Sequence, residues 1–337
     1  MSIKEIKRKI RRIVEEIRAT YEIARLTSFK QALGTFRAKF DIQKFVHNGF
    51  VETPSMKDHF MSKHKTMIQY FEKRYKDWWE NYTLPILYDA PENLRGKVWL
   101  CWWQGLDKAP EMVKKCIQSV KNRVGSDNVI VITDDNVMDY VDFPDFIIDK
   151  VQRGIISRTN FSDLLRMNIL SRYGGIWLDA TIYCNGSEIL KYLKQPVWSI
   201  KRPEYNHASV ACGYFAGYSI GADYEHRWVF KIMLDFFYHY WDTNDFLIDY
   251  LTISYCIVLS QKHFPEAKRL FEQIEPNNIH CDDLVRELGK PFDPEIWSKL
   301  QENTSLFKLT WKAKFPKETD GKPTFFAKIL SGELERD

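Results

Sequence analysis

The sequence has no run of about 18 uncharged apolar residues, the length that a membrane-spanning helix needs. Its first residues, MSIKEIKRKIRR, are basic, but no apolar segment with a small-residue cleavage site follows them, so no secretory signal is expected. A chain of 337 residues with 45% hydrophobic composition can nevertheless bury a large core. We therefore expect a globular protein that stays in the cytoplasm.

Motifs of several common enzyme classes are missing as well. The eight histidines include no H-E-x-x-H motif, which argues against a zinc hydrolase, and there is no Walker P-loop, G-x-S-x-G or G-x-G-x-x-G sequence. The six cysteines form no C-x-x-C pair, so we expect reduced thiols that serve as small apolar residues. The net charge of +4 is too small to predict nucleic-acid binding.

Residues 1–94 are expected to form a helical N-terminal extension whose first helix is basic and amphipathic. Apolar residues recur in that helix at helical spacing, and basic side chains crowd the rest of its surface. The apolar positions are Ile3, Ile6, Ile10, Ile13, Val14 and Ile17, and the basic ones are Lys4, Lys7, Arg8, Lys9, Arg11, Arg12 and Arg18. This pattern suits docking to anionic lipid or to a partner helix, and it equally suits a helix packed on its own domain.

Strands and helices alternate after about residue 95. The predicted elements are strands at 98–103, 128–133 and 176–178 and helices at about 110–123 and 157–174. Beyond residue 185 we expect strands near 197–200 and 211–218 and helices near 225–240 and 246–261. The alternation predicts an α/β protein with a parallel sheet and with ligands at the carboxyl ends of its strands, where Asp179 lies.

The segment SRTNFSDLLRMNILSRYGGIWLDATIYC, at 157–184, holds the charged residues best placed for chemistry. Its helix is apolar nearly all round and should be buried, yet Asp163 and Arg166 lie three residues apart on one face of it. The two either satisfy each other as an ion pair or face a cleft, where they can bind sugar hydroxyls and phosphate oxygens. Asp179 is either a turn residue or a ligand of a divalent cation that neutralises a diphosphate leaving group.

Several ordered motifs over about 215 residues resemble those of a known family. They are VWLCWWQGLDKAPEMVKKCIQSV, VIVITDDNV, the S-D-L-L-R helix leading into YGGIWLDAT, LIDYLTISY and the C-terminal FKLTWK. The span from about Lys97 to Lys312 thereby resembles the capsular polysaccharide synthesis glycosyltransferases, relatives of glycosyltransferase family 32. The resemblance implies a GT-A fold, which is a Rossmann-like nucleotide-sugar-binding domain, for residues 95–337.

The same resemblance implies an activity. This is the retaining transfer of a hexose, galactose or glucose, from a UDP-sugar donor to a lipid-linked oligosaccharide in capsular or surface polysaccharide synthesis. Mn²⁺ or Mg²⁺ is the implied cofactor. The basic N-terminal helix would then keep the enzyme peripherally on the anionic inner face of the cell membrane, beside its acceptor.

Site residues are implied position by position. Those for donor binding are Trp103, Gln104, Gly105, Asp163, Arg166, Asp179, Thr181 and Trp311, with Asp179 also as the metal ligand. Those for catalysis are Asp249, which faces the acceptor or is a paired core aspartate, and Lys312, which stabilises the departing phosphate or lies on a surface strand. Thr181 stands where the D-x-D motif of GT-A enzymes has its second aspartate, and Thr159-Asn160 replaces the family's Ala-His.

Two rival functions stay open. The missing second aspartate is compatible with a non-catalytic nucleotide-sugar-binding scaffold, which would bind UDP without turnover. A cell-wall phosphotransferase also uses carboxylate-bound metal on an α/β sheet, and among the three candidates it alone would leave phosphate on the acceptor.

Overall fold

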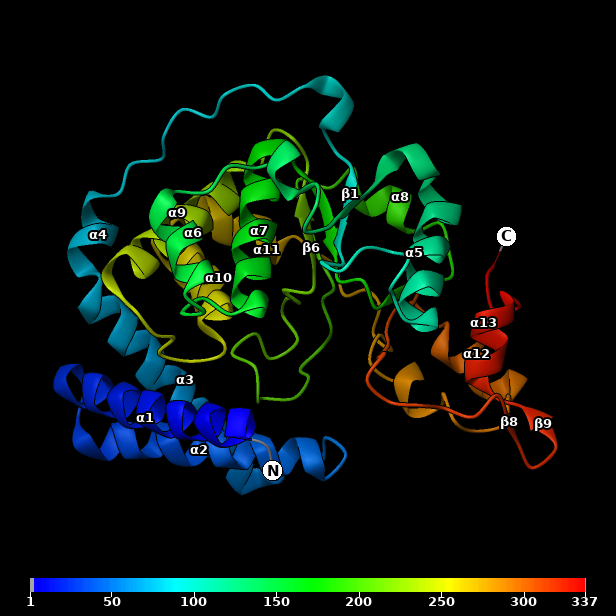
Figure 1. Ribbon diagram of the computed structural model, residues 1–337, viewed down its shortest axis with the longest axis horizontal. Coiled ribbons are helices and arrows are strands. Elements are labelled where there is room, and N and C mark those ends of the chain that lie inside the picture. The colour runs from blue at the N-terminus through cyan, green and yellow to red at the C-terminus, as the bar shows by residue number, and fades with distance from the viewer. Residues whose placement is uncertain (1–2, 337) are drawn as a thin grey trace.

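The computed structural model describes residues 3–336, with the backbone alone for residues 3–12. A central sheet lies between two groups of helices, and a helical N-terminal segment packs beneath one of them (Figure 1). The helices are α1 (Ile3–Leu26), α2 (Phe29–His47), α3 (Pro54–Arg74), α4 (Lys76–Asn81), α5 (Glu111–Val124), α6 (Asp145–Gln152), α7 (Arg158–Tyr173), α8 (Ile189–Tyr192), α9 (Trp228–Thr243), α10 (Thr252–His263), α11 (Pro265–Glu272), α12 (Pro294–Leu300) and α13 (Phe325–Ser331). The strands are β1 (Val98–Cys101), β2 (Val129–Ile132), β3 (Gly175–Leu178), β4 (Ile182–Cys184), β5 (Val197–Ser199), β6 (Ser219–Ala222), β7 (Leu306–Lys308), β8 (Glu318–Thr319) and β9 (Lys322–Pro323).

The main sheet has the strand order β2-β1-β3-β6-β5. Strands β2, β1 and β3 run parallel, because Val98 of β1 pairs with Val129 on one side and with Ile176 on the other. β6 runs antiparallel to β3, and β5 runs antiparallel to β6. The predicted α/β architecture with a parallel sheet is confirmed for the first three strands, and an antiparallel pair completes the sheet.

Alternate side chains of the strands enter two different cores, as the two-residue period of a strand requires. Trp99 and Trp177, which are register partners, pack in the core beneath α7 and α9. Their neighbours Val98 and Ile176 pack in the core beneath α5 and α8. Both faces of β1 and β3 are therefore covered by helices, as Figure 1 shows, and only the strand ends remain available for a ligand.

The turn between α7 and β3 needs the two glycines found there. Gly174 and Gly175 have φ of +62° and +87°, in the region that side chains avoid. A Cβ on Gly175 would lie 2.0 Å from the carbonyl oxygen of Lys97. This close approach brings β3 against β1 and sets Asp179 at the same sheet edge as the end of β1.

The N-terminal segment forms helices α1–α4, with α1 and α2 side by side along the bottom of Figure 1. The side chains of Ser28 and Thr53 accept hydrogen bonds from the first turns of α2 and α3, which fixes where these helices begin. Tyr70 and Phe71 of α3 join the same core as α9 and α10. Since the core continues across residue 95, the division into domains 1–94 and 95–337 stays a prediction.

One predicted element after residue 185 is wrong, and another begins later than expected. The strand near 211–218 is a series of turns, because Cys212 and Gly213 have φ of +46° and +91°, and the strand begins only at Ser219. The helix near 246–261 begins only at Thr252. The Asp249 carboxylate accepts the Leu251 N–H at 2.9 Å, and this local turn replaces the first helical turns.

Two further observations concern the cysteines and the apolar content of the helices. All six cysteines are unpaired, and four of them, Cys116, Cys184, Cys256 and Cys281, are buried, as expected of reduced thiols in a core. Within residues 3–336, no helix is both long enough and apolar enough to cross a membrane.

Candidate active site

A cleft of about 810 Å³ opens where β1 and β3 end. This volume is in the range of small-molecule binding sites, about 300–1,000 Å³. Its walls come from the ends of both strands, from α7, from the loops around 202–218 and 250–254, and from the stretch that follows β7. The cleft therefore lies where ligands of parallel α/β sheets bind, at the carboxyl ends of the strands.

Helix α7 presents one polar stripe to the cleft. Thr159, Ser162, Asp163 and Arg166 line it at positions i, i+3, i+4 and i+7, which is one face of an α-helix. The Arg166 guanidinium lies 3.5 Å from Asp163, so the ion pair expected from the spacing forms. Because both residues also line the cleft, the two interpretations of this pair are compatible.

Asp179 ties α7 to the end of β3. Its Oδ1 lies 3.4 Å from Arg166 and accepts the Trp177 indole N–H at 3.2 Å, while its Oδ2 accepts a hydrogen bond from Lys308 Nζ at 2.6 Å. Burial raises the pKa of the Asp179 carboxyl, but the Lys308 ammonium and the Arg166 guanidinium outweigh burial and hold that pKa below its usual value. The carboxylate is therefore ionised and already paired with two cations.

The residues present do not fit the Mn²⁺ or Mg²⁺ expected at Asp179. Both carboxylate oxygens are engaged by donors, and Thr181 replaces the second carboxylate of the D-x-D motif. In the described part of the chain, no three His, Cys, Asp or Glu side chains are grouped so as to hold a metal ion. A divalent cation prefers several free oxygen ligands, which this set does not supply.

Burial raises the pKa of Asp163 to about 6, with Arg166 opposing the shift and the charge of Asp179 adding to it. A folded-state pKa above the unfolded value of about 4 means that the folded protein holds this proton more tightly. The stabilisation of the folded state by this Asp163 proton is therefore complete below about pH 4 and is lost as the pH rises through about 6.

Asp163→Asn should remove this pH dependence. Its free energy of unfolding is expected to rise relative to wild type by about 1–2 kcal/mol from about pH 5 to about pH 7.5. Urea unfolding across that range measures the difference. Asp142→Asn, which changes an exposed carboxylate paired with Arg172, is the control. Parallel pH profiles for Asp163→Asn and wild type would contradict the expectation.

The predicted donor residues after β1 are only partly in the cleft. Trp103 and Gln104 line it, and the Trp103 indole N–H donates to Ser162 Oγ at 2.9 Å while its ring stacks on Phe161. Gly105 does not line the cleft; its φ of +77° closes a turn in which its N–H donates to the Trp102 carbonyl. Their roles in donor binding stay predictions.

The C-terminal segment closes one side of the cleft. Trp311 and Lys312 both line it, and the Trp311 ring meets the Trp102 ring edge-on with centroids 5.5 Å apart. Thr181 accepts the Leu309 N–H at 2.9 Å through its carbonyl oxygen, which holds this segment against the turn after β3. Thr181, Trp311 and Lys312 thus line the same cleft as Asp179, and their roles stay predictions.

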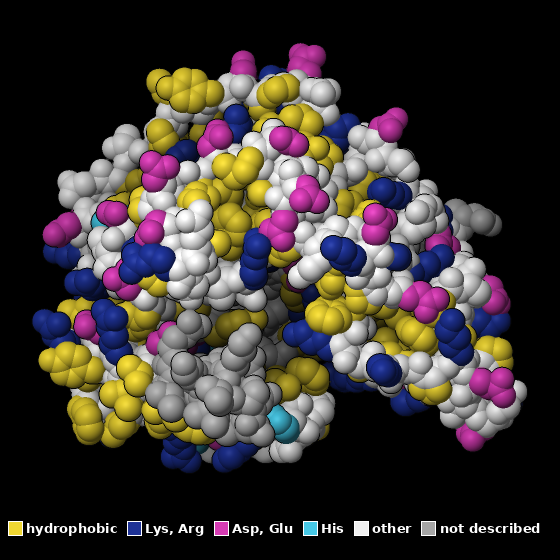
Figure 2. Space-filling view, viewed as in Figure 1, with side chains coloured by type: hydrophobic (Ala, Val, Ile, Leu, Met, Phe, Trp, Pro, Cys, Tyr) yellow, Lys and Arg dark blue, Asp and Glu magenta, His cyan; other side chains and the backbone are white. Residues whose placement is uncertain are grey.

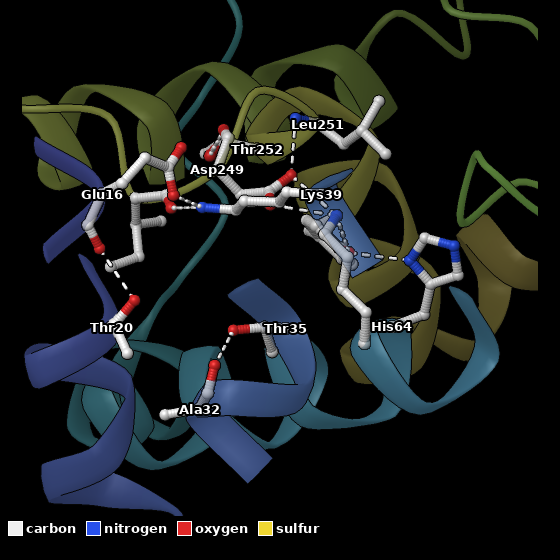
Figure 3. A network of polar contacts seen from close by, with 12 residues as sticks. Glu16, Thr20, Ala32, Thr35, Lys39, His64, Asp249, Leu251 and Thr252 are labelled. Atoms are coloured by element: carbon white, nitrogen blue, oxygen red, sulfur yellow. Dashed lines mark hydrogen bonds and ion pairs between the residues drawn. The ribbon is translucent and has the colours of Figure 1, made fainter. Parts of the chain in front are cut away.

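Asp249 lies behind the cleft wall rather than in it. Its side chain is 2% exposed and accepts a hydrogen bond from Lys63 Nζ of α3, with distances of 2.9 and 3.1 Å to the two oxygens. Figure 3 shows Asp249 with Lys39, Leu251 and Thr252 around it. Burial raises the pKa of Asp249, but Lys63 and Lys39 outweigh burial and keep the pKa below its usual value. This placement corresponds to the second of its two interpretations, a paired core aspartate.

Sequence reasoning missed several cleft residues. Lys308 reaches the cleft because β7 pairs with β4, and the sequence holds no local signal for that long-range pairing. Arg202 and Asp282 form an ion pair from distant loops, for which the sequence holds no signal.

The cleft carries an excess of positive charge. In the described residues its charged side chains are Arg158, Arg166, Arg202, Lys308, Lys312, Asp163, Asp179 and Asp282. Arg166 and Arg202 each also keep a buried Nε–H without a hydrogen-bond partner among the described residues. Five cations against three carboxylates, with spare donors, suit an anionic ligand such as a diphosphate.

Comparisons with known proteins place the chain in a family. A stretch of 117 residues is 31% identical to the O-glycosyltransferase braB of Annulohypoxylon truncatum, and it covers 32% of this chain and 27% of that protein. No solved structure gives a significant match. Residues 47–329 match the model of the family described as capsular polysaccharide synthesis protein. Because that match spans most of the sequence, the chain belongs to the capsular polysaccharide synthesis protein family.

Proposed function

We propose that this protein is a glycosyltransferase that uses a nucleoside diphosphate sugar as its donor. The observation that carries the proposal is the cationic cleft at the carboxyl ends of β1 and β3, which Arg166 lines beside Asp179. Its volume suits a nucleotide sugar, and the cleft residues Tyr250 and Trp311, which are 73% and 45% exposed, offer aromatic rings for a base or a sugar. Family membership and the name of the fungal relative support the same activity.

We further propose the finer assignments that the family resemblance suggests. They are a GT-A type of sheet, a UDP-hexose donor, retention of configuration, and a lipid-linked oligosaccharide acceptor. In this transfer the acceptor hydroxyl oxygen bonds to the anomeric carbon as the bond from that carbon to the diphosphate breaks. The bonding electron pair and the hydroxyl proton both go to the departing phosphate oxygen. In this proposal Arg166 and Lys312, which line the cleft, stabilise that oxygen.

The test is a panel of nucleotide sugars incubated with the purified protein and a glycolipid acceptor, once with chelator and once with Mn²⁺. Release of nucleoside diphosphate from one sugar donor, together with a glycosylated acceptor, supports the proposal. UDP binding with no release across the panel would instead indicate the non-catalytic scaffold. Phosphate left on the acceptor would indicate the phosphotransferase.

The exposed surface of α1 and α2 suggests where the protein meets its lipid-linked acceptor. Most of the predicted stripe of α1 lies outside the described side chains, but Ile13, Val14 and Ile17 are 58–63% exposed rather than packed on the protein. On α2, large apolar and cationic side chains share the exposed face: Phe29, Lys30, Leu33, Arg37, Phe40 and Lys44. The one carboxylate of that helix, Asp41, is buried against His59.

We propose that this face of α1 and α2 docks to an anionic membrane surface. Apolar side chains that insert among lipid tails and cations that meet lipid phosphates are the two requirements of such binding. Figure 2 shows hydrophobic and basic side chains together at the lower left, over these helices. Docking there would keep the cleft beside a lipid-linked acceptor.

Phe29→Ser/Phe40→Ser is expected to weaken binding to vesicles of mixed phosphatidylglycerol and phosphatidylcholine at least about tenfold, since each buried aromatic side chain contributes about 1.5–3 kcal/mol. Cosedimentation measures the binding. Ile86→Ser/Tyr88→Ser is the control, because it removes apolar side chains that are even more exposed, from the segment at the top of Figure 1. Equal binding by the Phe29/Phe40 variant and the control would exclude this surface.

A further inference from the structure

Lys308 is paired with Asp179, the carboxylate that the family resemblance assigns to a metal ion. β7 pairs antiparallel with β4, and the register sets Lys308 opposite Ile182, next to Thr181. From there its Nζ lies 2.6 Å from Asp179 Oδ2 and 5.1 Å from the centroid of the Tyr218 ring. The side chain is 26% exposed, so the ammonium is held by the protein and still reaches the cleft.

The other positive charges of the cleft are also held on lysine and arginine side chains. Arg166 holds the other oxygen of Asp179, and Lys312 and Arg202 line the cleft nearby. A diphosphate entering this cleft would therefore meet ammonium and guanidinium groups, which bind phosphate oxygens through charge-assisted hydrogen bonds. Those donors supply the charge neutralisation that a divalent cation supplies in other sites.

We propose that Lys308, together with Arg166, takes the place of a divalent cation, so that this protein binds and uses its nucleotide-sugar donor without metal. The role of Lys308 rests on the proposed glycosyltransferase function. Asp179 acts in this arrangement as a positioning residue, since it fixes both cations at the carboxyl end of β3. Lys308 touches the departing diphosphate and is a catalytic residue in that sense.

The experiment measures UDP binding by calorimetry in chelator and in Mn²⁺, alongside sugar transfer. Wild type should bind UDP equally in both conditions. Lys308→Met should bind about 10–100-fold more weakly in chelator, as expected for the loss of one hydrogen bond to a charged group. Mn²⁺ should restore part of that loss, because the substitution frees Asp179 Oδ2. Lys308→Arg keeps the charge and should stay within about threefold of wild type.

Lys317→Met is the matched control, because this exposed lysine of the same C-terminal region pairs with Glu111 outside the cleft. Melting curves establish that each variant folds. UDP binding by wild type only in the presence of Mn²⁺ would overturn the role of Lys308 and leave the proposed function standing. Unchanged binding by Lys308→Met in chelator would also overturn it. Absence of UDP binding in either condition would overturn both.

Discussion

Arg166→Ala is expected to lower kcat/KM for sugar transfer by about 10²–10³-fold, the usual loss for one fixed donor to a developing negative charge. The Arg166 guanidinium lies 3.5 Å from Asp163, 3.4 Å from Asp179 and over the Trp177 ring. Three contacts fix its orientation, and its Nε–H is left without a partner among the described residues. Because Arg166 also lines the cleft, its guanidinium is already oriented for a diphosphate oxygen, which is the condition for strong electrostatic stabilisation.

Arg172→Ala is the matched control for this prediction. Arg172 lies on the same helix, but its side chain is 45% exposed and pairs with Asp142 outside the cleft, so transfer should stay within about twofold of wild type. Arg166→Lys should recover only part of the activity, because an ammonium cannot reproduce the planar fork of the guanidinium. Wild-type kinetics for Arg166→Ala would remove Arg166 from the site.

The polar stripe of α7 and the position of Asp179 could be predicted because local rules determine them. Asp163 and Arg166 share a face through helical spacing alone, and Asp179 follows a short buried strand after a glycine pair. The contacts between them depend on β3 lying beside β1, and the alternating pattern predicts a parallel sheet but not this strand order. The position of Lys308 could not be derived in this way, because it depends on the pairing of β7 with β4 across more than a hundred residues.

The 246–261 segment shows why a local pattern can mislead. Its apolar residues suit a helix, yet the Asp249 side chain accepts the Leu251 N–H and its carbonyl accepts the Thr252 hydroxyl hydrogen. Because of these bonds the helix begins only at Thr252. The Asp249 carboxylate is held in place by Lys63, which lies 186 positions earlier in the sequence. Because the partner lies in the N-terminal segment, spacing within LIDY could not show that Asp249 faces inward.

Lys63→Ala is expected to lower the free energy of unfolding by about 3–5 kcal/mol, the usual cost of leaving one charge of a buried pair alone. Lys63 and Asp249 are 1% and 2% exposed, and the next cation, Lys39, lies 3.9 Å from Asp249 and is already paired with Glu16 (Figure 3). Urea unfolding measures the loss. Lys65→Ala, an exposed lysine of the same helix, should change stability by less than about 0.5 kcal/mol. A loss equally small for Lys63→Ala would show that Asp249 does not depend on this partner.

Lys63→Met/Asp249→Leu separates the two interpretations of Asp249. Replacing both charges with apolar side chains should recover most of the stability lost by Lys63→Ala, since no buried charge is left unpaired. Asp249 does not line the cleft, whereas its neighbours Tyr250 and Leu251 do, so we expect sugar transfer to recover together with stability. In that case Asp249 and Lys63 act by holding this cleft wall against the N-terminal helices. Recovered stability with transfer still lost by more than about 10²-fold would instead mean that the carboxylate itself acts on the acceptor, as the family resemblance implies.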